Sequence, residues 1–255
     1  MSTSLIFYGT SAAIPSLNRG FSCIGISDGN NGSVLFDCGD GALHNIMKFG
    51  LDVNSIKGIA LSHYHSDHLS GLTQVIETMG IRKRETQLPV FGPPGLKEYF
   101  STVQKITNVA SKRNFELRIT EVEPGRIFRV GDYPVESFKM DHTIPCNGYR
   151  VTVSNNKILS YTGDTMPCEA LKDLGNNADV LVHEATFLHK DLERSVPPKH
   201  STVLQAASVA KESGAKKLIL THVSDVNETQ ELMMKEAKPE FPNVTVAYDG
   251  YRSQI

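Results

Sequence analysis

The run His63-Tyr64-His65-Ser66-Asp67-His68 constrains this chain more than any other stretch of it. Three of the nine histidines in 255 residues fall within it, beside one aspartate, directly after the apolar segment 58–61. Side chains two apart on an extended segment face the same way, so His63 and His65 can reach one ion. Asp67 and His68 then turn toward a second. A helix would space its paired histidines at i and i+4, so this spacing indicates a strand-to-loop ligand set. The alternative is a polar surface loop rich in histidine.

Three further side chains of ligand type stand where other predicted strands end: His142, Asp164 and His222. Each alone is also explained as a buried side chain in a hydrogen bond. A carboxylate can bridge two cations, however, which makes Asp164 a candidate shared ligand. The sequence then predicts four protein ligands for each of two divalent ions, with Asp164 in common: His63, His65 and His142 for one, and Asp67, His68 and His222 for the other. Imidazole and carboxylate without thiolate favour zinc, with manganese or iron as alternatives.

This order of residues resembles the shared pattern of the metallo-β-lactamase superfamily, which is His-x-His-x-Asp-His, a later His, a Gly-Asp carboxylate and a final His. Within the superfamily the chain is similar to ribonuclease Z, the endonuclease that trims transfer-RNA 3′ ends. The segments that carry this likeness are Phe7-Tyr8-Gly9-Thr10-Ser11, Leu35-Phe36-Asp37-Cys38-Gly39-Asp40-Gly41, Phe91-Gly92-Pro93-Pro94-Gly95, Gly148-Tyr149-Arg150, His183-Glu184-Ala185-Thr186-Phe187, His200-Ser201-Thr202 and Ala247-Tyr248-Asp249. The resemblance implies an α/β fold, the four-layer αβ/βα metallo-β-lactamase sandwich, as one domain over residues 1–255.

The ligand set and the resemblance together imply a dinuclear phosphodiesterase. Two cations about 3.5–4 Å apart can hold a bridging hydroxide that attacks phosphorus. Asp67 is expected to be both a ligand and the acceptor that orients the nucleophile. In ribonuclease Z the histidine of His-Ser-Thr, braced by the glutamate of His-Glu-Ala-Thr, is thought to protonate the leaving alkoxide, and here those residues are His200 and Glu184. A carboxylate neighbour raises a histidine pKa and keeps it able to donate near pH 7. A loop hydrogen bond is the alternative role for His200.

Two aspartates are expected behind the metals. The family places the corresponding acidic motif where a carboxylate takes the free ring N–H of a metal-bound histidine, which fixes its tautomer. Asp37 and Asp40 occupy that motif here. Asp40 is equally well explained as a turn residue before Gly41.

Periodicity places the secondary structure between these motifs. Residues alternate or form short apolar runs in the predicted strands 3–8, 21–27, 33–37, 57–61, 88–91, 133–140, 148–153, 157–162, 179–182, 217–221 and 244–248. Apolar residues recur at three- and four-residue spacing in the predicted helices 41–49, 68–79, 94–109, 202–213 and 228–237. Ser201 and Thr202 are candidate caps for the fourth of these helices. Between residues 151 and 160 there is room only for a hairpin turning at Asn155-Asn156.

Composition predicts a cytoplasmic enzyme that does not enter the membrane. Hydrophobic residues make up 40% of the chain, and no apolar run approaches the ~20 residues needed for a membrane span. The first fifteen residues lack the pattern of a signal peptide. The four cysteines show no C-x-x-C spacing, which favours reduced thiols in a reducing compartment.

The sequence departs from ribonuclease Z in ways that bear on its substrate. Many family members insert a flexible basic arm that grips transfer RNA before the Gly-Asp-Thr strand, and this chain has no such insertion. Its net charge of −2 also lacks the basic bias expected of a protein that neutralises many phosphates. Local basic clusters exist at Arg82-Lys83-Arg84, at Lys112-Arg113 and at Lys199, and a solvated face is the simplest explanation for each.

Three functions follow, in order of preference. The first is a ribonuclease Z-like phosphodiesterase acting on precursor transfer RNA or on smaller diesters such as cyclic nucleotides. The second is hydrolysis of an ester, lactone or thioester by the same metal pair; the Glu184 and His200 pair argues against it, because a carboxylate or thiolate leaving group has little need of a general acid. The third is a non-catalytic binding protein, which the intact ligand set disfavours. Because ribonuclease Z relatives are usually dimers, a homodimer is expected.

Overall fold

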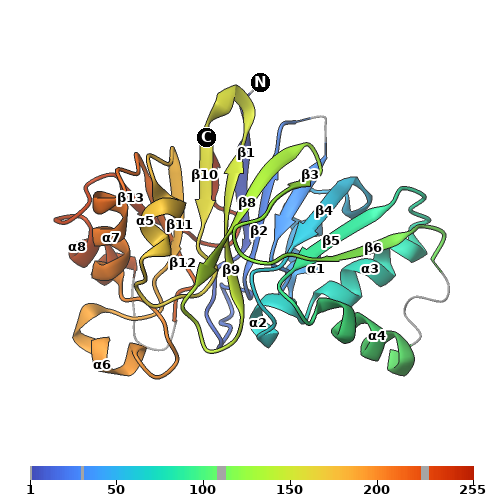
Figure 1. The fold of residues 1–255 in the computed structure, drawn as a ribbon, viewed down its shortest axis with the longest axis horizontal. Helices are drawn as coiled ribbons and strands as arrows, with labels where there is room; N and C mark the ends of the chain where they lie inside the picture. Colours follow the sequence, from blue (N-terminus) through green and yellow to red (C-terminus); the bar gives the residue numbers. More distant parts are fainter. Residues whose placement is uncertain (1, 30–31, 108–112, 225–229) are drawn as a thin grey trace.

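The computed structural model describes residues 2–29, 32–107, 113–224 and 230–255. Within them, one sheet is built largely from the first half of the chain (Figure 1). Its strands are β1 (Ser4–Gly9), β2 (Cys23–Ser27), β3 (Ser33–Phe36), β4 (Ile56–Ala60), β5 (Leu88–Gly92), β6 (Leu117–Glu121) and β14 (Arg252–Gln254). Their order is β14-β1-β2-β3-β4-β5-β6, and the pairs from β3 to β6 are parallel.

The second sheet takes its strands from the later part of the chain. They are β7 (Ile127–Val130), β8 (Tyr133–Met140), β9 (Cys146–Thr152), β10 (Ile158–Tyr161), β11 (Val180–Glu184), β12 (Leu218–Thr221) and β13 (Val244–Val246). Their order is β13-β12-β11-β10-β9-β8-β7, with parallel pairs from β10 to β13. In parallel strands of one sheet the carboxyl ends share an edge, and the predicted ligands lie at such ends.

Helices cover the outer faces of both sheets. They are α1 (Ala42–Lys48), α2 (Ser66–Leu69), α3 (Leu72–Ile81), α4 (Leu96–Thr107), α5 (Ala170–Gly175), α6 (Leu192–Ser195), α7 (Val203–Glu212) and α8 (Gln230–Ala237), with 3-10 turns at Val53–Ser55, Ser154–Asn156 and His189–Asp191. Figure 1 shows α1, α3 and α4 on one side of the molecule and α5, α7 and α8 on the other. None of the helices in the described parts of the chain is long and apolar enough to cross a bilayer.

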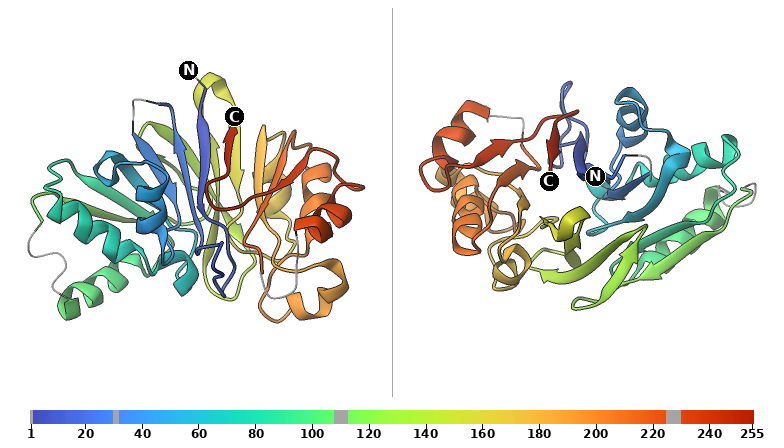
Figure 2. Two further views of the ribbon diagram at one scale, coloured as in Figure 1. Left: turned by 180° about the vertical axis from the view of Figure 1, so that it is seen from behind. Right: turned by 90° about the horizontal axis from the view of Figure 1, so that it is seen from above.

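The two sheets face each other (Figure 2), and one apolar cluster takes buried residues from both of them. Phe36 of the first sheet and Tyr149 of the second are both fully buried, and their ring centroids are 5.8 Å apart. Separate apolar clusters lie between the first sheet and α1 and α3, and between the second sheet and α7 and α8. The layers therefore run helix, sheet, sheet, helix, which confirms the predicted four-layer αβ/βα sandwich.

Most predicted elements are found within a few residues of their expected bounds. The strand 133–140 is matched by β8, and the predicted turn is confirmed because Asn155 and Asn156 both have positive φ between the antiparallel strands β9 and β10. Of the two predicted caps, Thr202 is the one that caps α7, and it does so in a reciprocal capping box with Gln205. The ends of two predicted helices, at 108–109 and 228–229, lie outside the described residues.

One predicted helix was wrong, since 68–79 is two helices, α2 and α3, separated at Ser70 and Gly71. The N–H of Gly71 donates to the carbonyl of Cys38 at 2.9 Å. A Cβ at Gly71 would lie 2.1 Å from the carbonyl oxygen of Gly39. The segment after the histidine-rich run is thus pinned against the loop that follows β3, which holds two parts of the predicted site together. The strands β6, β7 and β14 and the helices α5 and α6 were not predicted.

Candidate metal centre

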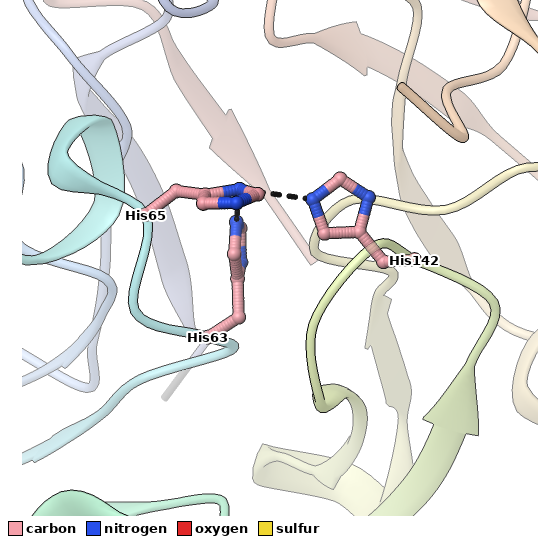
Figure 3. Close-up of side chains that lie close together, drawn as sticks. All are labelled: His63, His65 and His142. Carbon is pink, nitrogen blue, oxygen red and sulfur yellow. Dashed lines mark hydrogen bonds between the residues drawn. The ribbon is translucent and has the colours of Figure 1, made fainter. Parts of the chain in front are cut away.

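The first group of predicted ligands, His63, His65 and His142, converges at the sheet edge (Figure 3). His65 Nδ1 lies 3.1 Å from His63 Nε2 and 3.0 Å from His142 Nε2. We call these residues the three-histidine cluster. Burial lowers the pKa of all three rings. They are therefore neutral near pH 7, which is the state in which imidazole binds a cation.

The second group, Asp67, His68, Asp164 and His222, is buried throughout, and we call it the carboxylate cluster. Asp164 Oδ2 lies 3.2 Å from His68 Nε2 and 3.3 Å from His222 Nε2. His222 Nε2 is also 3.2 Å from Asp67 Oδ2. The same Asp164 oxygen is 3.7 Å from Nε2 of His63. Asp164 therefore lies between the two clusters, in the position expected of a shared ligand.

Short loops after the strands aim these side chains inward. His142 follows β8, Asp164 follows β10 and His222 follows β12. The residue before Asp164, Gly163, has φ +59°, and a Cβ there would lie 2.7 Å from Cβ of Ser62. Glycine is the residue that tolerates both this backbone conformation and this close approach. The Gly-Asp motif thus lets the β10 end pass directly over the β4 end.

Asp37 supports the carboxylate cluster from behind. Its Oδ2 lies 2.8 Å from His68 Nδ1, and it also accepts from the hydroxyls of Tyr161 at 2.6 Å and Ser62 at 2.8 Å. The predicted bond from Asp37 to a cluster histidine is thereby confirmed. Asp40 is instead exposed in the turn before α1, so it has the turn role rather than the supporting one.

In three other histidines, the ring nitrogen that points away from the site contacts an uncharged partner. His63 Nδ1 lies 2.9 Å from Ser62 Oγ, and His142 Nδ1 lies 3.2 Å from the carbonyl oxygen of Lys199. His222 Nδ1 lies 2.8 Å from Thr186 Oγ1. Such bonds fix which ring nitrogen faces the site. These partners were not predicted from the sequence. Hydroxyl groups and backbone carbonyls occur at many positions, so they carry no distinctive signal; Thr186 follows Glu184 in the His-Glu-Ala-Thr motif but was not singled out.

His200 and Glu184 form the predicted pair beside the clusters. His200 Nδ1 lies 2.8 Å from Glu184 Oε1, and 3.9 Å from Asp164 Oδ2. Burial opposes a charge on His200, but the Glu184 carboxylate outweighs it and raises the pKa of His200 to about 9. Glu184 also accepts from the N–H of Thr165 at 2.8 Å and from the Thr186 hydroxyl at 2.7 Å. These bonds fix a charged imidazolium at the rim of the carboxylate cluster.

The donor atoms fit divalent metal ions. At the centre, the buried Asp164 Oδ1 has no hydrogen-bond partner, and His68 Nε2 makes no hydrogen bond although the carboxylate oxygen Asp164 Oδ2 lies 3.2 Å from it. A buried polar atom without a partner is costly, and a cation at the cluster would satisfy both. The ligand atoms in each cluster lie within 4.8 Å of one another. The fold with this His and Asp cluster implies divalent metal binding.

The basic cluster after the metal motif lies away from this centre, and one expectation about it was wrong. Arg84 is not on a solvated face, because it is only 4% exposed. Its guanidinium donates to the carbonyls of Asn54, Thr86 and Gln87 at 2.7–2.9 Å. It therefore ties loops together and is unavailable to a phosphate. Lys112 lies outside the described residues.

Comparison with known proteins agrees with this geometry. A model of the beta-lactamase superfamily domain matches residues 33–223. Ribonuclease Z of Bacillus cereus is 30% identical, and the alignment covers 96% of both chains. The crystal structure of human tRNase Z, short form, superimposes with a TM-score of 0.83 at 27% identity and covers 98% of both chains. The metallo-beta-lactamase fold protein YhfI of Bacillus subtilis gives 0.86 at 23% identity over 99% of both chains, which shows the fold alone. The chain belongs to the metallo-β-lactamase superfamily and, within it, to the ribonuclease Z family.

Proposed function

We propose that this protein is a dinuclear metal-dependent phosphodiesterase of the ribonuclease Z type, built as one domain over residues 1–255. The observation that carries the proposal is the meeting of two ligand clusters at Asp164, directly beside the Glu184–His200 pair. The names of the related ribonuclease Z proteins support the same reaction class.

The ligand assignment belongs to this proposal. The three-histidine cluster would hold one cation and the carboxylate cluster the other, with Asp164 contributing to both. Zinc is the expected ion because the donors are imidazole and carboxylate, and manganese or iron are the alternatives. Bound there, two such ions supply a water-derived nucleophile near neutral pH and stabilise charge on the phosphoryl oxygens.

The chain's own residues then have distinct tasks. Burial disfavours a charge on Asp67, but its hydrogen bond with His222 and the nearby His68 hold the pKa of Asp67 at about 2. Asp67 is therefore an acceptor that can orient the nucleophile. The bond between His200 Nδ1 and Glu184 leaves His200 Nε2 free to protonate the leaving alkoxide. An alkoxide needs this proton, whereas a thiolate or carboxylate leaving group does not, so the pair favours a phosphodiester over a thioester.

The substrate is proposed as a phosphodiester, either a precursor transfer RNA or a small diester such as a cyclic nucleotide. The relative's alignment runs over 298 positions, more than the 255 residues of the chain, so the relative contains insertions that this chain lacks. This agrees with the absence of an arm between β9 and β10, where the turn contains only residues 153–157. Without an arm, an RNA substrate would be bound only through the small surface around the site itself.

A cytoplasmic homodimer is the proposed form. All four cysteines are free thiols, as expected in a reducing compartment. On the surface of α3 and α4, Ile81 is 81% exposed and Ile106 is 78% exposed, and Leu96 alone is buried among the α4 residues. A second copy would cover these side chains. Analytical ultracentrifugation at micromolar concentration tests this. A dimer that dissociates in Ile81→Lys supports the proposal. An unchanged protein that is already a monomer, with the same mass as Ile81→Lys, contradicts it.

The first experiment measures hydrolysis of bis(p-nitrophenyl) phosphate and of a precursor transfer RNA by zinc- and manganese-loaded protein. Asp67→Ala is the test variant, and Asp40→Ala changes an exposed aspartate as the matched control. Cleavage of both substrates, lost only in Asp67→Ala, supports a ribonuclease Z-like nuclease without the arm. Cleavage of the diester alone identifies a small-molecule phosphodiesterase. Failure on both by fully metallated protein contradicts the proposal and favours ester, lactone or thioester chemistry; protein that binds no metal would instead be a non-catalytic binding protein.

A further inference from the structure

Two cavities open at the metal centre, and different histidines of the centre line each of them. One, of about 580 Å³, is lined by His142 together with Lys139, Thr143 and Lys199. The other, of about 370 Å³, is lined by His200 and His222 together with Ile14, Phe187, Arg194 and Pro198. We call the second one the Phe187 cavity. His200 lines the Phe187 cavity and is not among the residues that line the first, so the two cavities are chemically distinct.

This asymmetry assigns a direction to the substrate. On cleavage, a water-derived oxygen forms a bond to phosphorus, the bond between phosphorus and the leaving oxygen breaks, its electron pair stays on that oxygen, and the proton comes from His200 Nε2. The leaving alcohol must therefore lie within reach of His200. His200 lines the Phe187 cavity, whereas the larger cavity is lined by His142 and not by His200. The group that departs thus occupies the Phe187 cavity.

The walls of the Phe187 cavity suit a flat, partly polar ring. The Phe187 ring is half-buried, and the Arg194 guanidinium carbon lies 5.7 Å from its centroid. Arg194 is held in place by Asp191 at 3.0 Å. Ile14, which also lines the cavity, is 61% exposed and so presents an apolar side chain to it. Aromatic rings and guanidinium planes are the surfaces on which unpaired nucleobases stack, and apolar side chains can cover the other face.

Backbone hydrogen bonds fix the position of Phe187 relative to the proton donor His200. Its carbonyl accepts from the N–H of Val203 at 2.8 Å, and its own N–H donates to the carbonyl of Ser201 at 3.4 Å. Ser201 is the neighbour of His200, so the ring and the proton donor are parts of one rigid unit. The Phe187 and His200 ring centroids are 6.2 Å apart. This spacing places a stacked base next to the alcohol that His200 protonates.

We propose that the Phe187 cavity binds the nucleobase of the leaving nucleoside, with Phe187 and Arg194 as its stacking surfaces. This inference rests on the proposed phosphodiesterase function and adds to it that the leaving alcohol belongs to a nucleoside. Phe187 and Arg194 are then specificity-determining residues, and they would favour base-bearing diesters over simple alkyl ones whatever the length of the nucleic acid.

The test uses the zinc-loaded full chain and three substrates: the dinucleotide uridylyl-uridine and two analogues that lack the base on one nucleoside or on the other. Product analysis identifies the leaving nucleoside, because it is the product without a phosphate. For the unchanged protein we expect removal of the leaving base to lower kcat/KM roughly ten-fold, the size of one base–aromatic stack. Removal of the other base should cost less.

Phe187→Leu should abolish most of this ten-fold preference, and Phe187→Tyr, which keeps a ring, should restore it. The matched control is Phe100→Leu, the same change at another half-buried phenylalanine, on α4, and it should keep the full preference. Equal losses on base-bearing and base-free substrates in Phe187→Leu would reject the inference, as would an unchanged protein that ignores the leaving base. Hydrolysis of bis(p-nitrophenyl) phosphate without cleavage of the dinucleotide rejects the nucleoside cavity but retains the phosphodiesterase. Failure on all substrates rejects the proposed function itself.

Discussion

The two ligand clusters differ in burial and in charge although they meet at one residue. In the three-histidine cluster His65 is half-exposed, and the rings are supported by a hydroxyl of Ser62 and a backbone carbonyl. The carboxylate cluster is buried throughout and contains two carboxylates, and a third carboxylate, Asp37, supports His68. A divalent cation is attracted more strongly to the charged, enclosed cluster. The difference leads us to expect an ion held more tightly at the carboxylate cluster than at the three-histidine cluster.

Loss of the shared ligand should have the largest effect on activity. It should weaken metal binding at both clusters and so remove the expected difference in affinity between them. In Asp164→Ala we expect both ions to be weakened and kcat/KM for a diester to fall by roughly 10⁴-fold. The estimate follows because metal ions supply several kcal/mol of transition-state stabilisation and about 1.36 kcal/mol corresponds to a factor of ten. Metal per chain, measured by mass spectrometry, should drop below two. Retention of two ions and full activity would show that Asp164 is not shared.

The acid pair lies beside both clusters, since the His200 ring centroid is 5.2 Å from that of His222 and also 5.2 Å from that of His142. His200→Ala should lower cleavage of a diester with a poor leaving group by roughly 10²–10⁴-fold, the range for general acid catalysis. The loss on bis(p-nitrophenyl) phosphate should be much smaller, because p-nitrophenolate leaves without a proton. Equal losses on both substrates would contradict a role as proton donor.

The same pair predicts a pH dependence. The pKa of His200 is raised to about 9, so the donor is protonated below that pH and is lost as pH rises through it. In Glu184→Gln the carboxylate that raises this pKa is gone, and the alkaline limb of the pH–rate profile should move to lower pH. If the alkaline limb does not move, the limb reports the ionisation of a group other than His200.

Removal of a supporting side chain should sharpen the contrast between the clusters. Asp37→Asn replaces the carboxylate behind His68 and should weaken metal affinity roughly 10–100-fold, as measured for such partners in other metal sites. Ser62→Ala removes a hydroxyl behind His63 and should weaken affinity by a smaller factor. Competition titrations with a chromogenic chelator give both constants. A larger effect of Ser62→Ala would reverse the proposed order of affinity.

The smallest expected effect is a difference in proton release. Burial disfavours a charge on His68, but the Asp164 and Asp37 carboxylates outweigh it and raise its pKa well above the ordinary value. His68 therefore carries a proton at neutral pH in the metal-free protein, and zinc must displace it. The rings of the three-histidine cluster have lowered pKa values and release none. Calorimetry in buffers of different ionisation enthalpy should detect one proton released from the ligands of the carboxylate cluster and none from those of the three-histidine cluster.

Several elements follow from local patterns. The strand Tyr133–Met140 alternates buried and less buried side chains along most of its length, and Thr202 with Gln205 forms a capping box, so both were predictable. The edge strands Leu117–Glu121 and Ile127–Val130 were missed because their side chains are mostly only partly buried or exposed, which weakens the pattern. The break at Gly71 depends on contact with Gly39, and helical periodicity does not record it.

The sequence by itself determined the ligand types, their order and their positions at strand ends, because donor chemistry and strand-to-loop spacing are local properties. Only the tertiary structure decided that His222 meets Asp67 across 155 residues, that Thr186 and a Lys199 carbonyl orient two of the rings, and that Phe187 lines a cavity beside His200. Such contacts depend on how two sheets pack face to face. A backbone carbonyl has the same chemistry at every residue, and a cavity is a property of several segments at once, so neither is visible before the chain folds.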